Sequence, residues 1–465
     1  MGKNVSLNKI TVLAIVSFLA ITVITFFKSA LELEDAEQAY YSQWLRWGYD
    51  DQPPLYTWLQ YGFNTIFKVN KLAFSILRAS LFAGILLALY QFAQLRIKEV
   101  EKSKLAVLLL VLVPVFIDFT FRRLSHTSLL CLSVIASYYC VQLLVSRKSI
   151  LNYLLLGLVV GVGIMSKYNY VFFLLTFALV SLWDKELRAI VFNPKILVSV
   201  LVSVLLVAPH AYWLLGPDGF QYYLESSLEE KIGTEEVGSG FSLMPILRYL
   251  KGLFALLFPV LLFVGIGYFS NVVSFNKQKK HWFAKMFIVQ LLVLGVFFLV
   301  FQSQKVETRW LLPLFIPFVV LLLEKVNLKN NQRLVSIGYW VFIAVIGLQT
   351  LRTPIEKMLN IPSSVHFGFE PVAHKLKYED YQWVLPNVTY AGNVRVLHPE
   401  RTLFSVDDYS LGQSKSKNQK WVEVIIDPSK ERQKVAVDSL IGFGKEKENL
   451  YFYIGQGTKN SLSQP

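Results

Sequence analysis

Long apolar segments recur along almost the whole chain and are separated by short polar stretches. A membrane-spanning helix needs about 20 predominantly apolar residues, and roughly eleven segments approach or reach that length. The segments are 10–30, 72–95, 104–120, 126–145, 149–166, 168–183, 196–215, 247–270, 282–302, 310–324 and 333–350. The pattern predicts an α-helical polytopic membrane protein with about eleven transmembrane helices, whose ends are defined to within a few residues.

Two polar regions between the apolar segments are too long to be simple turns. The first, 31–71, alternates apolar and polar positions on both sides of Pro53-Pro54, which predicts two short amphipathic helices in the membrane interface. The second, 216–246, is acidic and contains several glycines, which suggests a mobile lid over a site. A solvated acidic loop is the alternative interpretation of that second region.

The apolar pattern ends near residue 350, so the chain divides into a transmembrane domain, 1–350, and a soluble tail, 351–465. Short runs rich in β-branched and aromatic residues predict strands in the tail. These runs are 384–385, 388–390, 394–397, 421–426 and 450–454. Residues 366–378 and 428–440 are candidate helices, so the tail is predicted to be a small α/β domain.

Composition supports a membrane protein, because 54% of the residues are hydrophobic and phenylalanine alone occurs 35 times. The formal net charge of +14 comes mainly from Lys and Arg in alternate loops, while the other set of loops carries acids. This alternation follows the positive-inside rule. It predicts a cytoplasmic N-terminus and an extracytoplasmic tail, and it explains the basicity without a nucleic-acid partner.

The first apolar segment is predicted to be a retained span. It is about as long as a spanning helix, and Lys28 stands where a signal-peptide cleavage site would need a small residue. The two cysteines, Cys131 and Cys140, share one apolar segment, so neither a disulfide framework nor a zinc motif is expected. Both are interpreted as packing residues.

Three acids, Glu34, Asp35 and Glu37, follow the first span directly. The predicted topology places them on the outer face together with cations and polar groups at the ends of other spans. Those groups are Arg122, Arg123, His126, Lys167, Tyr168, His210, Lys305 and Arg309. Charged groups at a membrane boundary commonly bind or transform a ligand. A carboxylate that shares a surface with several cations suits a reaction on an anionic, lipid-linked substrate.

Structural roles compete with this interpretation for several residues. Arg122 and Arg123 could set the topology or bind lipid phosphates. The histidines are more often held by local hydrogen bonds than used in catalysis. Lys167 is harder to explain structurally, because it interrupts an apolar run in which a lysine is unfavourable.

At these residues the chain resembles glycosyltransferase family 39 and its relatives, the protein O-mannosyltransferases and the lipid A aminoarabinose transferases of the glycosyltransferase C superfamily. The first outer loop carries the resemblance with Glu34-Asp35-Ala36, Tyr40-Tyr41 and 47–55, which reads Trp-Gly-Tyr-Asp-Asp-Gln-Pro-Pro-Leu. Further similarity lies in Gly163–Tyr168, in 305–313 with its Lys-x-x-x-Arg-Trp pattern, and in the tail at Ala391-Gly392-Asn393-Val394-Arg395.

Two departures from the family pattern bear on the site. The acidic pair is Glu34-Asp35 rather than Asp-Glu, so an ungapped comparison puts Glu34 at the catalytic position while chemistry favours Asp35. Between the third and fourth spans, relatives often show Thr-Pro-Asp, whereas this chain has Ser125-His126-Thr127. A second family acid is therefore missing there, unless Asp118 replaces it.

The resemblance implies an inverting transferase that uses a polyprenyl-phosphate sugar in a bacterial cytoplasmic membrane. The acceptor would be a hydroxyl or amine of a lipid, glycan or protein. Asp35 or Glu34 would be the general base. Lys167 and Arg309, helped by Arg122 or Arg123, would stabilise the phosphate, and Lys305 would bind substrate. Glu37, Tyr40, Tyr41 and Tyr168 would bind substrate, although interface anchoring explains the tyrosines equally well.

No cofactor is expected, although a divalent ion shared by Glu34, Asp35 and Glu37 is the alternative. Two other classes of protein compete with an enzyme. A secondary transporter would carry its polar residues near the bilayer midplane and show internal repeats, neither of which the sequence displays. A polysaccharide ligase or a lipid-handling protein is the remaining alternative.

Overall fold

The computed structural model describes residues 8–49, 52–123, 125–216, 242–275, 281–408 and 420–456. The chain forms two compact units. Unit 1 comprises 1–19, 47–56 and 78–347, and unit 2 comprises 20–46, 57–77 and 348–465. Helices α1 (Lys9–Ile24), α4 (Lys71–Arg96) and α17 (Asn331–Met358) run from one unit into the other.

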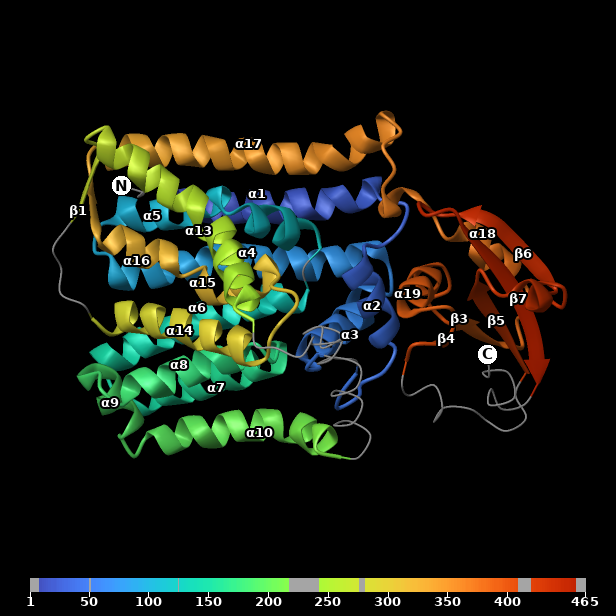
Figure 1. The fold of residues 1–465 in the computed structure, drawn as a ribbon, viewed down its shortest axis with the longest axis horizontal. Helices are drawn as coiled ribbons and strands as arrows, with labels where there is room; N and C mark the ends of the chain where they lie inside the picture. The colour runs from blue at the N-terminus through green and yellow to red at the C-terminus, as the bar shows by residue number, and fades with distance from the viewer. Residues whose placement is uncertain are drawn as a thin grey trace, which may run out of the picture. The chain divides into compact units, whose positions relative to one another are not determined.

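Unit 1 is almost entirely helical (Figure 1). Its α-helices are α5 (Val100–Leu108), α6 (His126–Ser146), α7 (Ile150–Ser166), α8 (Tyr170–Ser181), α9 (Lys185–Val191), α10 (Ile196–Leu214), α13 (Met244–Phe269), α14 (Trp282–Val300), α15 (Thr308–Phe315) and α16 (Phe318–Glu324). Two short strands, β1 (Val273–Phe275) and β2 (Val326–Leu328), pair antiparallel. Helix α7 packs between α6 and α10, and α8 packs on α14.

Small residues allow the close packing of α7 and α10. A Cβ added to Gly157 would lie 2.6 Å from the backbone oxygen of Ser199, so only glycine fits there. The Ser199 hydroxyl donates to the backbone oxygen of Tyr153 at 2.6 Å. Small residues and interhelical hydrogen bonds of this kind are typical of helix contacts within membranes.

Among the residues that the structure describes, seven helices are long and apolar enough to cross a membrane by length and composition. They are 9–27, which is α1 with the 3₁₀ turn η1 (Thr25–Phe27), and α4, α6, α10, α13, α14 and α17. The segments predicted at 149–166 and 168–183 form α7 and α8, which are apolar but shorter. The polytopic helical architecture is thus confirmed, whereas the number eleven is not.

Prolines account for two of the predicted spans that are not continuous α-helices. The segment 104–120 contains Pro114 and divides into α5, the 3₁₀ turn η2 (Leu109–Leu112) and the π turn η3 (Phe116–Thr120). The segment 310–324 divides at Pro317 into α15 and α16. Proline removes a backbone donor and clashes with the preceding turn, so it interrupts a helix even in an apolar run.

Unit 2 contains α2 (Leu33–Tyr41) and all but the first two residues of α3 (Leu55–Phe67), the two helices predicted for the first outer loop. The Thr57 hydroxyl of α3 donates to the Gln38 side chain of α2 at 2.7 Å. The Asn64 amide of α3 donates to the Ser42 hydroxyl at 2.8 Å. The two helices of the loop are therefore joined by buried polar contacts.

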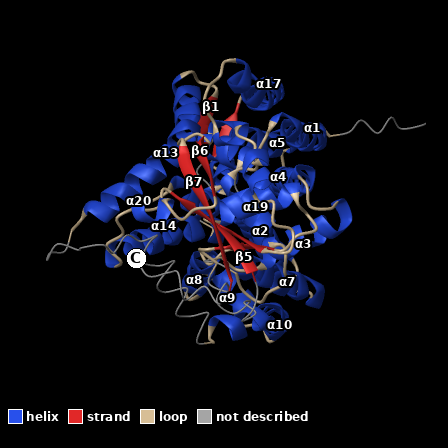
Figure 2. Ribbon diagram, turned by 90° about the vertical axis from the view of Figure 1, so that its right-hand side faces the viewer, coloured by secondary structure: helices blue, strands red, loops and turns tan. Residues whose placement is uncertain are grey.

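The tail carries a mixed five-stranded sheet of order β4-β3-β5-β7-β6, coloured red in Figure 2. Its strands are β3 (Gln382–Leu385), β4 (Leu403–Ser405), β5 (Lys420–Ile426), β6 (Asp438–Phe443) and β7 (Glu448–Gln456). Strands β3, β4 and β5 are parallel, whereas β5 and β6 each pair antiparallel with β7. Val384, Phe404, Trp421 and Tyr453 form a buried core cluster.

The strands predicted at 388–390 and 394–397 were wrong, because both lie in one helix, α19 (Val388–Leu397). The Asn387 side chain caps this helix by accepting from the backbone N–H of Tyr390 at 3.1 Å. The helix connects the parallel strands β3 and β4, a connection that needs a crossover. The β propensity of residues 388–397 is therefore outweighed by the helix cap at Asn387 and by the need for a crossover between β3 and β4.

The helices predicted in the tail are shorter than expected. Residues 366–378 contain the end of the 3₁₀ turn η5 (Ser364–His366) and α18 (Glu370–Lys375). Residues 428–440 contain α20 (Lys430–Gln433) followed by the first residues of β6. The second prediction was thus partly wrong, since Asp438 onward pairs with β7 as a strand.

Candidate functional site

Helix α2 carries the three acids of the segment 31–71. Glu34 and Asp35 lie in its first turn, where the positive end of the helix dipole favours carboxylates. Asp35 is buried, and Glu34 and Glu37 are half-buried. Because Glu37 follows Glu34 by three positions, these two share one face of the helix, while Asp35 points about 100° away from Glu34.

The two tyrosines of α2 lie in the interior of the protein. Tyr40 is fully buried, and its hydroxyl donates to Asp408 Oδ2 at 2.7 Å. Burial, and then the Asp408 carboxylate, raise the pKa of this hydroxyl far above its ordinary value. Tyr41 packs edge-to-face on Tyr40 with ring centroids 5.2 Å apart. Packing explains both rings in this structure, and their predicted contact with substrate stays a prediction.

Asp408 also binds Arg46, whose Nη1 lies 3.2 Å from Asp408 Oδ2. The Arg46 guanidinium in turn stacks 4.2 Å from the Trp44 ring centre. The sequence had not singled out Asp408 as a functional residue. Asp408 lies 368 positions after Tyr40, and the local sequence, Asp407-Asp408, does not indicate that Tyr40 is its partner.

In unit 1, the predicted cation Lys167 lies in the extended turn between α7 and α8. Its Nζ donates to the Thr127 hydroxyl in the first turn of α6 at 3.0 Å. His126 is buried one residue before, with Nδ1 3.3 Å from the Ser166 backbone oxygen. The structure therefore brings Lys167 next to the segment Ser125-His126-Thr127.

The neighbouring aromatic and imidazole side chains are held by local contacts. The Tyr168 hydroxyl lies 3.0 Å from His210 Nε2, and His210 Nδ1 lies 2.7 Å from the Trp47 backbone oxygen. The His126 ring packs on Tyr56 at 5.2 Å between centroids. Both histidines are thus bound locally, as the structural interpretation of their roles predicted.

The other predicted cations of unit 1 differ in exposure. Arg122 is buried, and its backbone oxygen accepts from Arg78 Nη1 at 2.6 Å, whereas Arg123 is exposed. Lys305 is also exposed, and Arg309 is half-buried in the first turn of α15, which packs against α6. The Arg309 Nε lies 3.8 Å from Glu307 Oε2.

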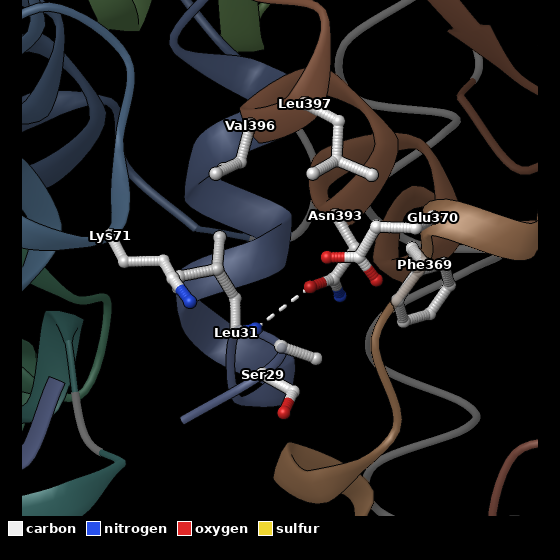
Figure 3. A pocket seen from close by; sticks show the side chains of 9 residues that line it. Ser29, Leu31, Lys71, Phe369, Glu370, Asn393, Val396 and Leu397 are labelled. Carbon is white, nitrogen blue, oxygen red and sulfur yellow. Dashed lines mark hydrogen bonds between the residues drawn. The ribbon is translucent and has the colours of Figure 1, made fainter. Parts of the chain in front are cut away.

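A small pocket of about 40 Å³ lies in unit 2 beside the start of α2 (Figure 3). Its polar lining includes Ser29, Lys71, Glu370 and Asn393. The Lys71 ammonium donates to the Lys28 backbone oxygen at 2.6 Å. Ligand pockets usually measure several hundred Å³, so this space suits water molecules better than a sugar.

Across the described residues, no three Asp, Glu, His or Cys side chains gather as metal ligands. Binding of one divalent ion by Glu34, Asp35 and Glu37 together would need a different arrangement of these side chains. Most of the predicted lid, 216–246, lies outside the described residues, which do not include 217–241. Asp50 and Asp51 also lie outside the described residues.

Comparison with known proteins defines the class to which this fold belongs. Residues 51–213 match the family described as dolichyl-phosphate-mannose-protein mannosyltransferase. The structure is similar to the crystal structure of ArnT from Cupriavidus metallidurans bound to undecaprenyl phosphate, with a TM-score of 0.59 and 12% identity. The match covers 95% of this chain and 97% of ArnT. The predicted glycosyltransferase C fold is therefore confirmed.

Two curated relatives extend the similarity to sequence. The chain is 26% identical over 392 residues to the lipopolysaccharide core galacturonosyltransferase RgtA of Rhizobium johnstonii, covering 80% of this chain and 76% of RgtA. It is 24% identical over 385 residues to RgtB of the same organism, covering 80% and 72%. Together these matches confirm the predicted resemblance and the prediction of a membrane glycosyltransferase.

Proposed function

We propose that this protein is an inverting glycosyltransferase that moves a sugar from a polyprenyl phosphate to a hydroxyl or amine acceptor. The acceptor would be a lipid, a glycan or a protein at the outer face of a bacterial cytoplasmic membrane. One observation carries the proposal. The similarity to a lipopolysaccharide galacturonosyltransferase extends over 392 residues and covers 80% of this chain.

The chemistry of such a donor fits the candidate residues. The acceptor oxygen or nitrogen attacks the anomeric carbon, the bond from that carbon to the phosphate oxygen breaks, and polyprenyl phosphate leaves with the electron pair. Phosphate is a good leaving group at neutral pH, so cations that stabilise its charge suffice on that side. We assign this role to Lys167 and Arg309, with Arg122, Arg123 and Lys305 as supporting cations. ArnT, which shares the fold, was solved with undecaprenyl phosphate bound.

The acceptor must lose a proton during the attack, and a carboxylate is suited to take it. We assign this role to Asp35, with Glu34 as the alternative. Both lie in the first turn of α2, where the helix dipole favours the charged carboxylate that a base requires. Attack on the face opposite the leaving phosphate inverts the anomeric centre.

The membrane arrangement is part of the same proposal. The distribution of Lys and Arg among the loops favours a cytoplasmic N-terminus, and with eleven spans it favours an extracytoplasmic C-terminal domain from residue 351 onward. The lid, 216–246, and this domain are the regions that we expect to select the acceptor. Galacturonic acid, the sugar in the names of RgtA and RgtB, is the first sugar to test.

The test is a transfer assay with purified full-length protein in lipid nanodiscs. The donors are undecaprenyl phosphates that carry radiolabelled galacturonic acid, aminoarabinose or mannose, and the acceptor is truncated lipopolysaccharide. We expect one donor to be consumed with release of undecaprenyl phosphate and inversion at the labelled sugar. Neither transfer nor hydrolysis with any donor would contradict the proposal. Uptake of a labelled sugar into proteoliposomes without bond cleavage would support a transporter instead.

A further inference from the structure

Helix α2 is too short to define its own position. It has nine residues, and isolated helices shorter than about 12–15 residues are marginal in water. The Glu32 side chain at its N-cap pairs with Lys28 at 3.4 Å rather than capping the helix. The direction in which the Glu34 and Asp35 side chains point must therefore be set by the elements packed against α2.

The beginning of α2 is bound by Asn393 of α19. The Asn393 Oδ1 accepts from the backbone N–H of Leu31 at 2.7 Å, shown as the dashed line in Figure 3. The Asn393 Nδ2 donates to the backbone oxygen of Thr389 at 3.0 Å, which fixes the amide within its own helix. A single side chain thus uses both ends of its amide to join the chain just before α2 to α19.

The end of α2 is bound by Arg395, two residues further along α19. Its Nη1 donates to the backbone oxygen of Ala39 and, at 3.3 Å, to the Ser42 hydroxyl. The backbone oxygens in the last turn of a helix lack intrahelical partners, and the dipole there favours a cation. Arg395 is buried, so its guanidinium satisfies these oxygens where water does not reach.

Between these two contacts the helices touch through their backbones. A Cβ added to Gly392 would lie 1.8 Å from the Ala36 backbone oxygen and 2.9 Å from its Cα. Ala36 and Ala39 belong to a buried cluster with Leu31 and Phe74, against which Val396 of α19 also packs. One short helix of the tail therefore binds both ends and the middle of α2.

We infer that Asn393 and Arg395 are positioning residues that hold α2, and with it the carboxylates of Glu34 and Asp35, in the orientation that catalysis requires. This inference rests on the proposed function, because it assigns a catalytic purpose to the contact between α19 and α2. The tail thereby contributes to turnover through two side chains that are not themselves proposed to touch substrate.

The experiment compares Arg395→Met, Arg395→Lys and Asn393→Leu with the wild type. Arg401→Met is the matched control, because Arg401 lies in the same tail and its guanidinium contacts the Glu379 backbone oxygen and the Trp383 ring rather than α2. Initial rates are measured with undecaprenyl phosphate galacturonate and truncated lipopolysaccharide. Hydrogen–deuterium exchange of the amides of 33–41 and 55–67 is followed in the same preparations.

We expect kcat to fall roughly 10- to 100-fold in Arg395→Met and Asn393→Leu, because small misplacements of reacting groups have effects of that size. The KM for the donor should change little. Arg395→Lys keeps the positive charge and at least one hydrogen-bond donor, so its kcat should lie between that of Arg395→Met and that of the wild type. Exchange should accelerate in 33–41 but not in 55–67, and Arg401→Met should match the wild type in both readouts.

Unchanged kcat and unchanged exchange of 33–41 in both Arg395→Met and Asn393→Leu would overturn the inference. If one variant fails to fold, the other and Arg395→Lys still decide the question. Failure of the proposed function is recognised separately through Asp35→Asn and Glu34→Gln. Wild-type turnover in both of these would refute the assignment of the base, whereas their inactivity combined with full activity of the α19 variants would refute the positioning role alone.

Discussion

The contact between Gly392 and Ala36 leads to a prediction about a single methyl group. Alanine at position 392 would place its Cβ 1.8 Å from the Ala36 backbone oxygen, where ordinary contact begins at 3.4 Å. The two helices would have to separate by about 1.6 Å, because the clashing atoms belong to backbone and no rotamer change relieves them. Such separation would also stretch the hydrogen bonds that Asn393 and Arg395 make to α2.

The expected magnitude combines two opposing effects. Overpacking in a well-packed core typically destabilises by 1–3 kcal/mol, and backbone clashes belong at or above the upper end of that range. Alanine is favoured over glycine within a helix by about 1 kcal/mol, which offsets part of the loss. We therefore expect Gly392→Ala to destabilise the contact between α19 and α2 by about 2 kcal/mol.

Gly62 of α3 provides the matched control, since it is also a helical glycine of unit 2. Among the described residues, no atom beyond its chain neighbours and the adjacent backbone of its own helix lies within 4 Å of a Cβ built at Gly62, so Gly62→Ala should be neutral or slightly stabilising. Thermal unfolding in nanodiscs and amide exchange of 33–41 are the assays. The reasoning would be refuted if Gly392→Ala unfolded at the temperature of Gly62→Ala and left the exchange of α2 unchanged.

Three further predictions concern stability. A hydrogen bond from Lys375 at 2.6 Å lowers the pKa of Asp438, so the pair stabilises the fold above the ordinary aspartate pKa and loses this effect as the pH falls through the lowered value. Lys375→Met should therefore lower the free energy of unfolding at pH 7 slightly, by under about 1 kcal/mol for this partly exposed pair. The difference from the wild type should shrink below pH 3.8, and a constant difference down to about pH 2 would contradict this. The Asp184 side chain caps α9, and asparagine can cap a helix whereas alanine cannot. Asp184→Ala should therefore be less stable than Asp184→Asn by about 1 kcal/mol. Equal unfolding temperatures of the two variants would argue against the cap. Arg96 and Glu324 form a buried pair at 2.6 Å, so Arg96→Met or Glu324→Met alone should destabilise the fold by about 3–5 kcal/mol. The double variant should be destabilised by less than the sum of the two single variants. Strict additivity would show that the pair is not coupled.

The sequence predicted the features that depend on local pattern. Apolar length predicted the spanning helices, and Pro53-Pro54 between two amphipathic stretches predicted α2 and α3. Alternation and β-branched residues predicted β5 and most of β7. Where these signals failed, a local feature of another kind decided the structure. Pro114 and Pro317 interrupted apolar segments, and the cap at Asn387 turned a strand-like segment into α19.

The contacts that hold the acidic helix could not be predicted in the same way. Leu31 and Asn393 are 362 positions apart, and neither residue type indicates the other. In the sequence, the Ala-Gly-Asn-Val-Arg segment shows only a resemblance to a family, and its contacts with α2 depend on the fold. The same holds for the candidate site. A carboxylate at the end of a span indicates a site in the sequence, but the residues that position this carboxylate are defined only by the fold.

The central claim is that a carboxylate of α2 drives transfer from a polyprenyl phosphate, and one measurement tests it most directly. Wild type, Asp35→Asn and Glu34→Gln are incubated in nanodiscs with undecaprenyl phosphate galacturonate and truncated lipopolysaccharide, and the release of undecaprenyl phosphate is followed. We predict that the wild type releases it and that Asp35→Asn loses at least about 100-fold in kcat while still binding the donor. Release at the wild-type rate by both variants would contradict the account.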